Sequence, residues 1–443
     1  MLGVVKSTER ILIDIGIGGS TTGTYTLTKG QNPDNCVPFL SLGYITAVTP
    51  DAREWLFDAH FLDSPARLVV TRSDTTSRLQ IGGYVVEFDP NKVRVQQKSF
   101  TVPDYVDPAP QYVSVNLDDT INTSRSAVVI YYRVTSPGAE RSWMEVHLRA
   151  YNMSSTQVRL IRHGGSGAVC ALTGNYFVFE SLDGAFTTQY YDLVFNTSAY
   201  SDSHTLSSPV NLNKSWIVPA TYYSAHNDDR CDSDMARINF QSASAVEGSR
   251  DAAAAYLVAS SYVVEHHDDT RVFTGEISWA AAESGTKTDT LPDTVDLDYS
   301  VACPSSQIGM MKTDNADWAN AYQSSFARHL MAGGGTQVQV YRVGNDGASW
   351  TQYQVIEFAP APGYYVGGYV TEEGSAVERT VRSYRRDTGA FLNETTSSGV
   401  GGHFYLETSY SGSQYVVCVD DDTGLEYNAL IYDSIMPTTI SGG

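Results

Sequence analysis

The sequence has few cysteines and no long apolar segment, and these absences exclude several classes of protein. Its five cysteines are scattered, odd in number and never spaced Cys-x-x-Cys, so neither a zinc ribbon nor a disulfide framework is indicated. No run of about 18 or more apolar residues occurs, so we expect no membrane insertion. The first ten residues lack the apolar core of a signal peptide. We therefore expect a chain that folds in a reducing cytoplasm.

Basic residues are also scarce. The 443 residues include 29 Lys and Arg against 50 Asp and Glu, which gives a formal net charge of −21. Contacts with phosphates need clustered Lys or Arg, so we expect no nucleic-acid partner. A nucleophile elbow, a His-Glu-x-x-His motif and a phosphate-binding loop are all missing. We predict a protein that is not an enzyme and has no cofactor, although paired carboxylates of the glycosidase kind carry no local motif and stay open.

One short pattern occurs four times along the chain. An arginine ends a strand-like run, small polar residues follow it, and a Tyr-x-Val run comes next, as in Tyr84 to Phe88. The arginines recur at intervals of 90, 88 and 92 residues, and the tyrosines at 92, 86 and 91. Two independent landmarks with one period indicate a tandem repeat. The landmarks are Arg72, Arg162, Arg250 and Arg342, with Tyr84, Tyr176, Tyr262 and Tyr353.

Each copy of the pattern predicts a β-hairpin. Apolar and polar residues alternate before the arginine, as at Val338 and Val340, which is typical of a strand with one buried face. Hydrophobic residues make up 42% of the chain, enough for packed cores. We predict an all-β fold of four tandem β-sandwich domains and a C-terminal sandwich. The expected boundaries are 1–92, 93–182, 183–270, 271–361 and 362–443. Modules that contact mainly their neighbours would stack into a rod.

Several recurring residues could be read as functional sites. Three histidines, His60, His147 and His329, precede arginines by 12, 15 and 13 residues. No carboxylate or histidine partner recurs with them, so we interpret the histidines and the arginines as structural, held by hydrogen bonds or stacking. The run 314–331 could form a helix, but its alignment with the earlier repeats favours a strand. Acidic clusters at 226–234 and 265–269 could bind calcium, although neither has EF-hand spacing, and solvated turns explain them as well.

The last 80 residues differ from the repeats and resemble a known type of sandwich. Gly368-Tyr369-Val370, the turn at Asp387-Thr388-Gly389, Gly402-x-Phe404 and Tyr415-Val416-Val417 are similar to the carboxypeptidase-regulatory-like, transthyretin-type fold. The close of the chain, 427–437, resembles the C-terminal ends of tailed-bacteriophage structural proteins. The repeat hairpins are similar to those of phage virion domains.

This resemblance implies a structural component of a virion that is made in the host cytoplasm without a signal peptide. Its partners would be other virion proteins and copies of itself. A tail-associated, fibre or adaptor protein is the first hypothesis, and a capsid-surface decoration protein is the second. A third is a carbohydrate-binding module for host recognition, for which the 29 tyrosines matter. A lectin should show clustered exposed aromatics, an assembly protein apolar patches, and an enzyme a deep cleft with two carboxylates.

Overall fold

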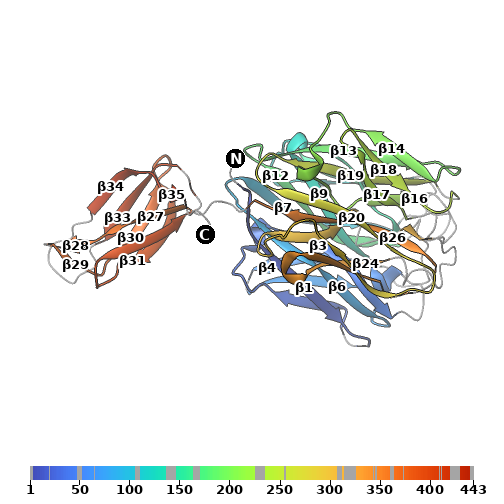
Figure 1. Cartoon of the computed structure of the whole chain (residues 1–443), viewed down its shortest axis with the longest axis horizontal. Coiled ribbons are helices and arrows are strands. Elements are labelled where there is room, and N and C mark those ends of the chain that lie inside the picture. The colour runs from blue at the N-terminus through green and yellow to red at the C-terminus, as the bar shows by residue number, and fades with distance from the viewer. Residues whose placement is uncertain are drawn as a thin grey trace. The chain divides into compact units, whose positions relative to one another are not determined.

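The computed structural model of the chain consists of two compact units, Gly3–Pro360 and Ala361–Gly443 (Figure 1). Strands dominate both units, and α1 (Ala52–Trp55) is a single helical turn, so the all-β prediction is confirmed. The structure describes residues 3–18, 20–46, 52–63, 65–104, 110–135, 146–162, 170–224, 235–253, 256–306, 312–313, 326–342, 344, 347–359, 364–372, 374–408, 410, 412–419 and 430–439.

The first unit contains four repeats with one topology. Repeat one has a long antiparallel sheet of order β1-β6-β3 and a short one of order β2-β5-β4. We call these the long sheet and the short sheet of each repeat. The strands of repeat one are β1 (Val5–Ile15), β2 (Thr22–Thr26), β3 (Cys36–Thr46), β4 (Phe57–Asp63), β5 (Ala66–Arg72) and β6 (Arg78–Phe88).

The next two repeats follow the same order. Their long sheets are β7-β12-β9 and β13-β19-β15, with β16 also paired to β19, and their short sheets are β10-β11-β8 and β14-β18-β17. The strands are β7 (Val93–Val102), β8 (Gln111–Asn116), β9 (Ser126–Val134), β10 (Arg149–Met153), β11 (Gln157–Arg162), β12 (Leu172–Ser181), β13 (Phe186–Phe195), β14 (Ser201–Thr205), β15 (Ser215–Ile217), β16 (Thr221–Ser224), β17 (Arg237–Ser242), β18 (Ala245–Ser249) and β19 (Leu257–His266).

Repeat four has a long sheet β20-β26-β22, with β23 also paired to β26, and a short sheet β21-β25-β24. Strand β24 covers the end of the run at 314–331, so the strand prediction is confirmed there, while 314–325 lie outside the described residues. The strands are β20 (Arg271–Trp279), β21 (Gly285–Thr290), β22 (Ser300–Pro304), β23 (Lys312–Thr313), β24 (Ala327–Ala332), β25 (Gln337–Arg342) and β26 (Ser349–Glu357).

The repeats close into a ring. The prediction of a hairpin in each repeat is wrong, because its first strand lies in the short sheet and its second in the long sheet, as with β5 and β6, so the turn joins two sheets and the two strands do not pair with each other. Strands β4, β10 and β17 pack on the long sheet of the following repeat, and β24 packs on β3 and β6 of repeat one. The amide of Thr8 donates to the carbonyl of Asp298 at 2.8 Å, which joins repeat one to repeat four. The expected rod is therefore wrong, because the fourth repeat has the first as a neighbour.

Each contact between repeats is here called a seam, and three of the four seams have a charged pair that includes the second strand residue of β4 or the first of β10 or β17. Arg133 donates to Asp58 at 2.9 Å between repeats one and two, and Arg149 donates to Asp192 at 2.7 Å between two and three. Arg237 pairs with Glu276 between three and four. At the closing seam Arg328 instead lies over two glycines of repeat one, Gly43 and Gly82, where any Cβ would collide with its side chain. The four seams are alike in position and different in chemistry.

Aromatic side chains from all four repeats meet in one cluster. Phe179 of β12 stacks on Trp216 of β15, with ring centroids 6.3 Å apart, and on Phe88 of β6 at 5.8 Å. Phe88 also contacts Phe358, which follows β26, at 6.2 Å. All four rings are buried. The hydrophobic effect therefore favours the assembled ring over separate repeats, since the same apolar surface is shared among them.

The second unit is a small sandwich. One sheet has order β32-β27-β35 and the other has order β31-β30-β33-β34, with a separate hairpin β28-β29. Its core consists of Val366, Val381, Leu406 and Val416. The strands are β27 (Tyr364–Tyr369), β28 (Thr371–Glu372), β29 (Ser375–Ala376), β30 (Thr380–Arg385), β31 (Phe391–Thr396), β32 (His403–Thr408), β33 (Gln414–Val419), β34 (Leu430–Ile435) and β35 (Thr438–Thr439).

Candidate functional site

The four recurring arginines are buried and donate hydrogen bonds to loops of their own repeats. Arg162 donates to the carbonyl of Pro103 at 2.5 Å and to Gln111 at 2.7 Å. Arg250 donates to the carbonyls of Ala199 and Asn196 at 2.9 and 2.6 Å. Arg72 and Arg342 likewise donate to a loop carbonyl and a serine hydroxyl. The interpretation of these arginines as structural hydrogen-bond donors is confirmed.

A recurring glutamate in the same pattern has a role that sequence analysis missed. In every repeat its carboxylate accepts a hydrogen bond from the backbone amide of an Asn or Asp, at 2.7 to 3.2 Å. That Asn or Asp accepts in turn from the amide two residues on, which fixes a tight turn ahead of the third strand. The pairs are Glu87 with Asn32, Glu180 with Asn122, Glu265 with Asn211 and Glu357 with Asp296.

The three histidines do not share one position, contrary to their alignment in the sequence. His60 pairs in register with Val69, whereas His329 pairs with Val340, which is one step closer to the recurring arginine. His147 precedes β10. His147 and His329 are buried, and His60 lies near Asp58 at 3.6 Å. A common metal or catalytic site built on these three residues has no geometric basis.

Of the two acidic clusters, 226–234 lies outside the described residues. The cluster at 265–269 is occupied by structural contacts. Glu265 accepts from Asn211, Asp268 accepts from the amide of Thr270 at 3.0 Å, and His267 lies 3.1 Å from the hydroxyl of Thr187. Across the described residues, no group of three or more His, Cys, Asp or Glu is placed to hold a metal ion.

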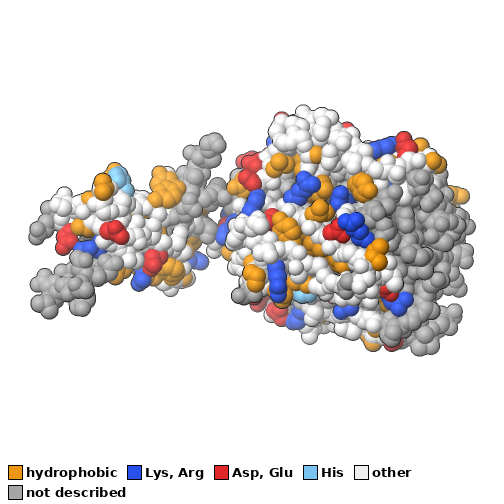
Figure 2. Space-filling model, turned by 90° about the horizontal axis from the view of Figure 1, so that it is seen from below, with side chains coloured by type: hydrophobic (Ala, Val, Ile, Leu, Met, Phe, Trp, Pro, Cys, Tyr) orange, Lys and Arg blue, Asp and Glu red, His pale blue; other side chains and the backbone are white. Residues whose placement is uncertain are grey.

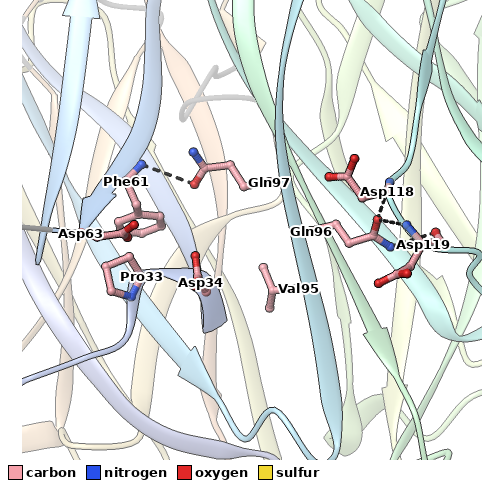
Figure 3. Close-up of a pocket in the computed structure, with 9 residues that line it drawn as sticks. All are labelled: Pro33, Asp34, Phe61, Asp63, Val95, Gln96, Gln97, Asp118 and Asp119. Carbon is pink, nitrogen blue, oxygen red and sulfur yellow. Dashed lines mark hydrogen bonds between the residues drawn. The ribbon is translucent and has the colours of Figure 1, made fainter.

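A cavity of about 340 Å³ lies at the seam between repeats one and two (Figure 3). Four aspartates line it, Asp34, Asp63, Asp118 and Asp119. Lys98 pairs with Asp118, and Arg94 lies 3.5 Å from Asp119. The side chain of Gln96, also in the wall, accepts from the amides of both Asp118 and Asp119 at 2.9 Å. These contacts all lie within repeat two, and the seam itself is crossed by the amide of Phe61, which donates to the side chain of Gln97 at 3.4 Å.

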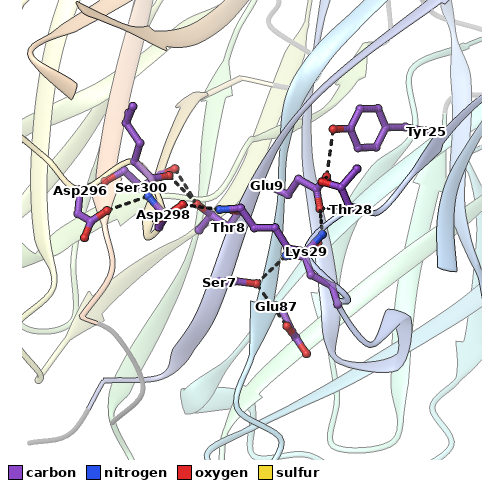
Figure 4. Close-up of polar contacts among 12 residues, drawn as sticks. Ser7, Thr8, Glu9, Tyr25, Thr28, Lys29, Glu87, Asp296, Asp298 and Ser300 are labelled. Carbon is purple, nitrogen blue, oxygen red and sulfur yellow. Dashed lines mark hydrogen bonds and ion pairs between the residues drawn. The ribbon is translucent and has the colours of Figure 1, made fainter. Parts of the chain in front are cut away.

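The closing seam is held by a network of polar groups (Figure 4). The Thr8 hydroxyl lies 3.2 Å from the carbonyls of both Leu297 and Ser300. Lys29 donates to Asp298 of repeat four at 2.6 Å and to the carbonyl of Thr8 at 2.8 Å. Because Thr8 is buried, the bonds of its amide and hydroxyl are shielded from water and fix repeat four against β1, whereas the pair of Lys29 and Asp298 is exposed.

Next to this seam, Glu9 is a buried carboxylate surrounded by neutral donors. The Tyr25 hydroxyl donates to it at 3.0 Å, and Thr28 donates through its amide at 3.0 Å and its hydroxyl at 2.6 Å. Burial, followed by the bond to Glu9, raises the pKa of Tyr25. The carboxylate therefore organises the turn that carries Lys29 to the seam.

We expect Glu9→Gln to destabilise the first unit by about 2 kcal/mol. The side-chain nitrogen of glutamine would replace a carboxylate oxygen that now accepts hydrogen bonds from backbone amides. Urea denaturation followed by tryptophan fluorescence measures the change. Glu283→Gln, at a carboxylate with a side-chain exposure of 46%, is the matched control and should cost less than half as much. Equal midpoints for the two variants would contradict the assigned role of Glu9.

A different kind of surface lies on the second unit. On β27 and β32 four residues on one face are aromatic, with Tyr365 stacked on Tyr405 at 4.8 Å and Tyr369 against His403 at 4.3 Å, and Glu407 is the register partner of Tyr365. Tyr369 is 66% exposed and Tyr405 is 47% exposed. We call these four residues the aromatic face. Clustered exposed aromatics were named above as the feature that would distinguish a lectin, but the sequence did not indicate where they would lie.

Comparison with known proteins gives no family for this chain. No protein-family profile matches it, and no curated protein matches it. A C-terminally truncated trimeric ectodomain of the C. elegans fusion protein EFF-1 aligns over 98% of both chains, at 7% identity and a TM-score of 0.10. A score this low carries no argument. None of the helices in the described residues is long and apolar enough to cross a membrane.

Proposed function

We propose that this chain is a structural component of a bacteriophage virion, associated with the tail as a fibre or adaptor protein. The observation that supports it most is the contrast between the two units. The recurring arginines and glutamates of the first unit are used in holding its own repeats together. A unit whose repeats are held together in this way is suited to a load-bearing or scaffolding position in an assembly.

The second unit supports the same proposal through its surface. Fifteen large apolar or aromatic side chains are notably exposed among the described residues, and seven of them lie in these 83 residues. Figure 2 shows such side chains on the part of this surface that it displays. Contiguous exposed apolar patches mark interaction sites, and this unit carries nearly half of the exposed large side chains in less than a fifth of the chain. The seven are Tyr369, Phe391, Val400, Tyr405, Ile431, Tyr432 and Met436.

The test is to locate the chain on intact particles of a phage that encodes it. Mass spectrometry of purified particles should detect the chain, and cryo-electron microscopy should place the ring of four repeats at the tail or baseplate. Density on the shell would replace the tail assignment with the capsid-decoration alternative. Absence of the chain from purified particles would refute the virion proposal.

A further inference from the structure

The closing seam contains an arginine that has no acidic partner within the described residues. At each of the other three seams, the charged residue near the start of β4, β10 or β17 has a partner of opposite charge in the next repeat. Arg328 is the second residue of β24, which packs on repeat one in the same way. Its side chain has no hydrogen bond or ion pair to any described residue, and its guanidinium lies over the ring of Tyr341, 5.4 Å from the centroid.

The seam between repeats two and three shows what the partners of such an arginine are. Arg149 donates to the carboxylate of Asp192 at 2.7 Å and also to the hydroxyl of Ser260. Asp192 and Ser260 are register partners on the first and central strands of the long sheet, and Ser260 lies two residues before the recurring tyrosine of its repeat. The arginine is therefore held by two acceptors that face each other across one strand pair.

In repeat one, the two equivalent positions have no side-chain acceptor. The register partners two residues before its recurring tyrosine are Leu12 and Gly82. Arg328 lies at this point, because a Cβ on Gly82 would come within 2.3 Å of its Cδ. Leu12 is 49% exposed, so an apolar side chain occupies the position at which repeat three presents a carboxylate.

A second arginine adds positive charge to the same surface. Arg10 is exposed on β1, and its side chain makes one bond, of 3.4 Å, to a carbonyl of β24. Burial, followed by the repulsion of Arg10, lowers the pKa of Arg328, and both guanidinium groups stay charged. Asp14 lies on the same face of β1 but is paired with Arg78. Two like charges therefore share this surface, and no carboxylate of the described residues pairs with either of them.

We propose that the closing seam binds a carboxylate at Arg328 that comes from outside the ring. A partly buried charge without a partner costs free energy, and a carboxylate is the group that a guanidinium pairs with through two parallel hydrogen bonds. The chain itself uses a carboxylate at the equivalent point of repeat three. The exposed Leu12 offers an apolar surface to the carbon atoms of the ligand, which favours an organic carboxylate over an inorganic anion.

A free carboxylate and an acidic side chain of a second copy of this chain share this chemistry. The chain has 50 Asp and Glu residues, so a second copy could supply the group. The inference does not depend on the virion proposal, because both sources can be tested on the purified chain.

The first experiment measures thermal unfolding of the full-length chain in sodium butyrate and in sodium chloride of equal ionic strength, with butyramide as the uncharged analogue. We expect butyrate alone to raise the unfolding midpoint of the first unit by about 1–2 °C, because a ligand of the folded state stabilises that state. Arg328→Gln should abolish the difference between the two salts. Lys287→Gln removes a positive charge elsewhere in repeat four and should keep the difference.

A second pair of variants supplies the missing acceptor from within the chain. Leu12→Asp places a carboxylate at the position equivalent to Asp192 of repeat three. It should raise the midpoint in chloride by about 1–2 °C and should no longer respond to butyrate. Leu12→Asn has the same shape without the charge, and it should be no more stable than the unaltered chain.

Analytical ultracentrifugation in chloride identifies the source of the carboxylate. Self-association that both Arg328→Gln and butyrate abolish would assign the carboxylate to a second copy, and a monomer that butyrate stabilises would assign it to a free ligand. The proposal is overturned if butyrate has no effect on the midpoint and the chain stays monomeric or associates independently of Arg328. It is equally overturned if Arg328→Gln responds to butyrate like the unaltered chain, or if Leu12→Asp and Leu12→Asn have the same midpoint.

Discussion

Acidification from pH 6.5 towards pH 4 is expected to unfold the first unit. Burial lowers the pKa of His147 and His329 to about 3 and that of His266 to about 4. In the unfolded chain these imidazoles would take up protons near pH 6.5, whereas in the folded chain they stay neutral. The unfolded state then binds more protons, so stability falls as the pH falls. Three such groups together give a slope of about 4 kcal/mol per pH unit near pH 5.

Urea denaturation at half-unit steps between pH 7.5 and pH 4.5 measures this slope. His147→Gln should reduce it by about one third, because one of the three groups no longer titrates. His60→Gln, at a histidine with a side-chain exposure of 30%, controls for the loss of an imidazole. A free energy of unfolding that stays level from pH 6.5 to pH 4.5 would show that the buried histidines take up protons without unfolding.

Phe179→Ala is expected to cost about 3–5 kcal/mol, the range found for large aromatic residues removed from a core. The reason is the position of Phe179, whose ring lies within 6.4 Å of Phe39 and Phe88 of repeat one and of Trp216 and Phe186 of repeat three. The cavity would be shared by three repeats, so no single repeat can collapse to fill it.

The measurement is the unfolding midpoint in urea, with Tyr200→Ala as the control for loss of an aromatic ring. Tyr200 is 60% exposed, and its removal should change stability by less than about 0.5 kcal/mol. We also expect Phe179→Ala to lower the midpoint for the whole first unit at once. Separate transitions for individual repeats would mean that the aromatic cluster does not couple them.

Local features of the sequence predicted the strands well. Alternation of apolar and polar residues around Val338 and Val340 predicted β25, which is buried on one face, and the Tyr-x-Val runs became the central strands of the long sheets. The period of about 90 residues predicted four equivalent units. These signals are readable because strand periodicity and turn chemistry act over a few neighbouring residues.

The closure of the four repeats into a ring could not be predicted from such local signals. The residues that form the seams, such as Asp58, Arg149 and Arg237, differ in type from one repeat to the next. A search for recurring residues therefore passes over them. The alignment of the histidines was wrong for the opposite reason. His60 and His329 have similar spacing from an arginine but lie at different points of the strand register.

Some features of the candidate site could be predicted from the sequence, and others could not. The hydrogen bonds of the recurring arginines followed from their repetition, but the partners of the recurring glutamates lie 54 to 61 residues upstream at a varying distance. The aromatic face needed the pairing of β27 with β32, because Tyr369 and His403 are distant in the chain.

The charges at the seams also distinguish repeat one from the two repeats that follow it. A head-to-tail ring made from four identical copies would be a homotetramer, in which any copy could follow any other. Here the charge at the equivalent position is Asp58 in repeat one and an arginine, Arg149 or Arg237, in the next two. If repeat one took the place of repeat two or three, its Asp58 would meet another carboxylate, Asp192 or Glu276. After duplication within one gene, such divergence would fix the place of repeat one in the ring, while repeats two and three keep the same pairing of an arginine with a carboxylate.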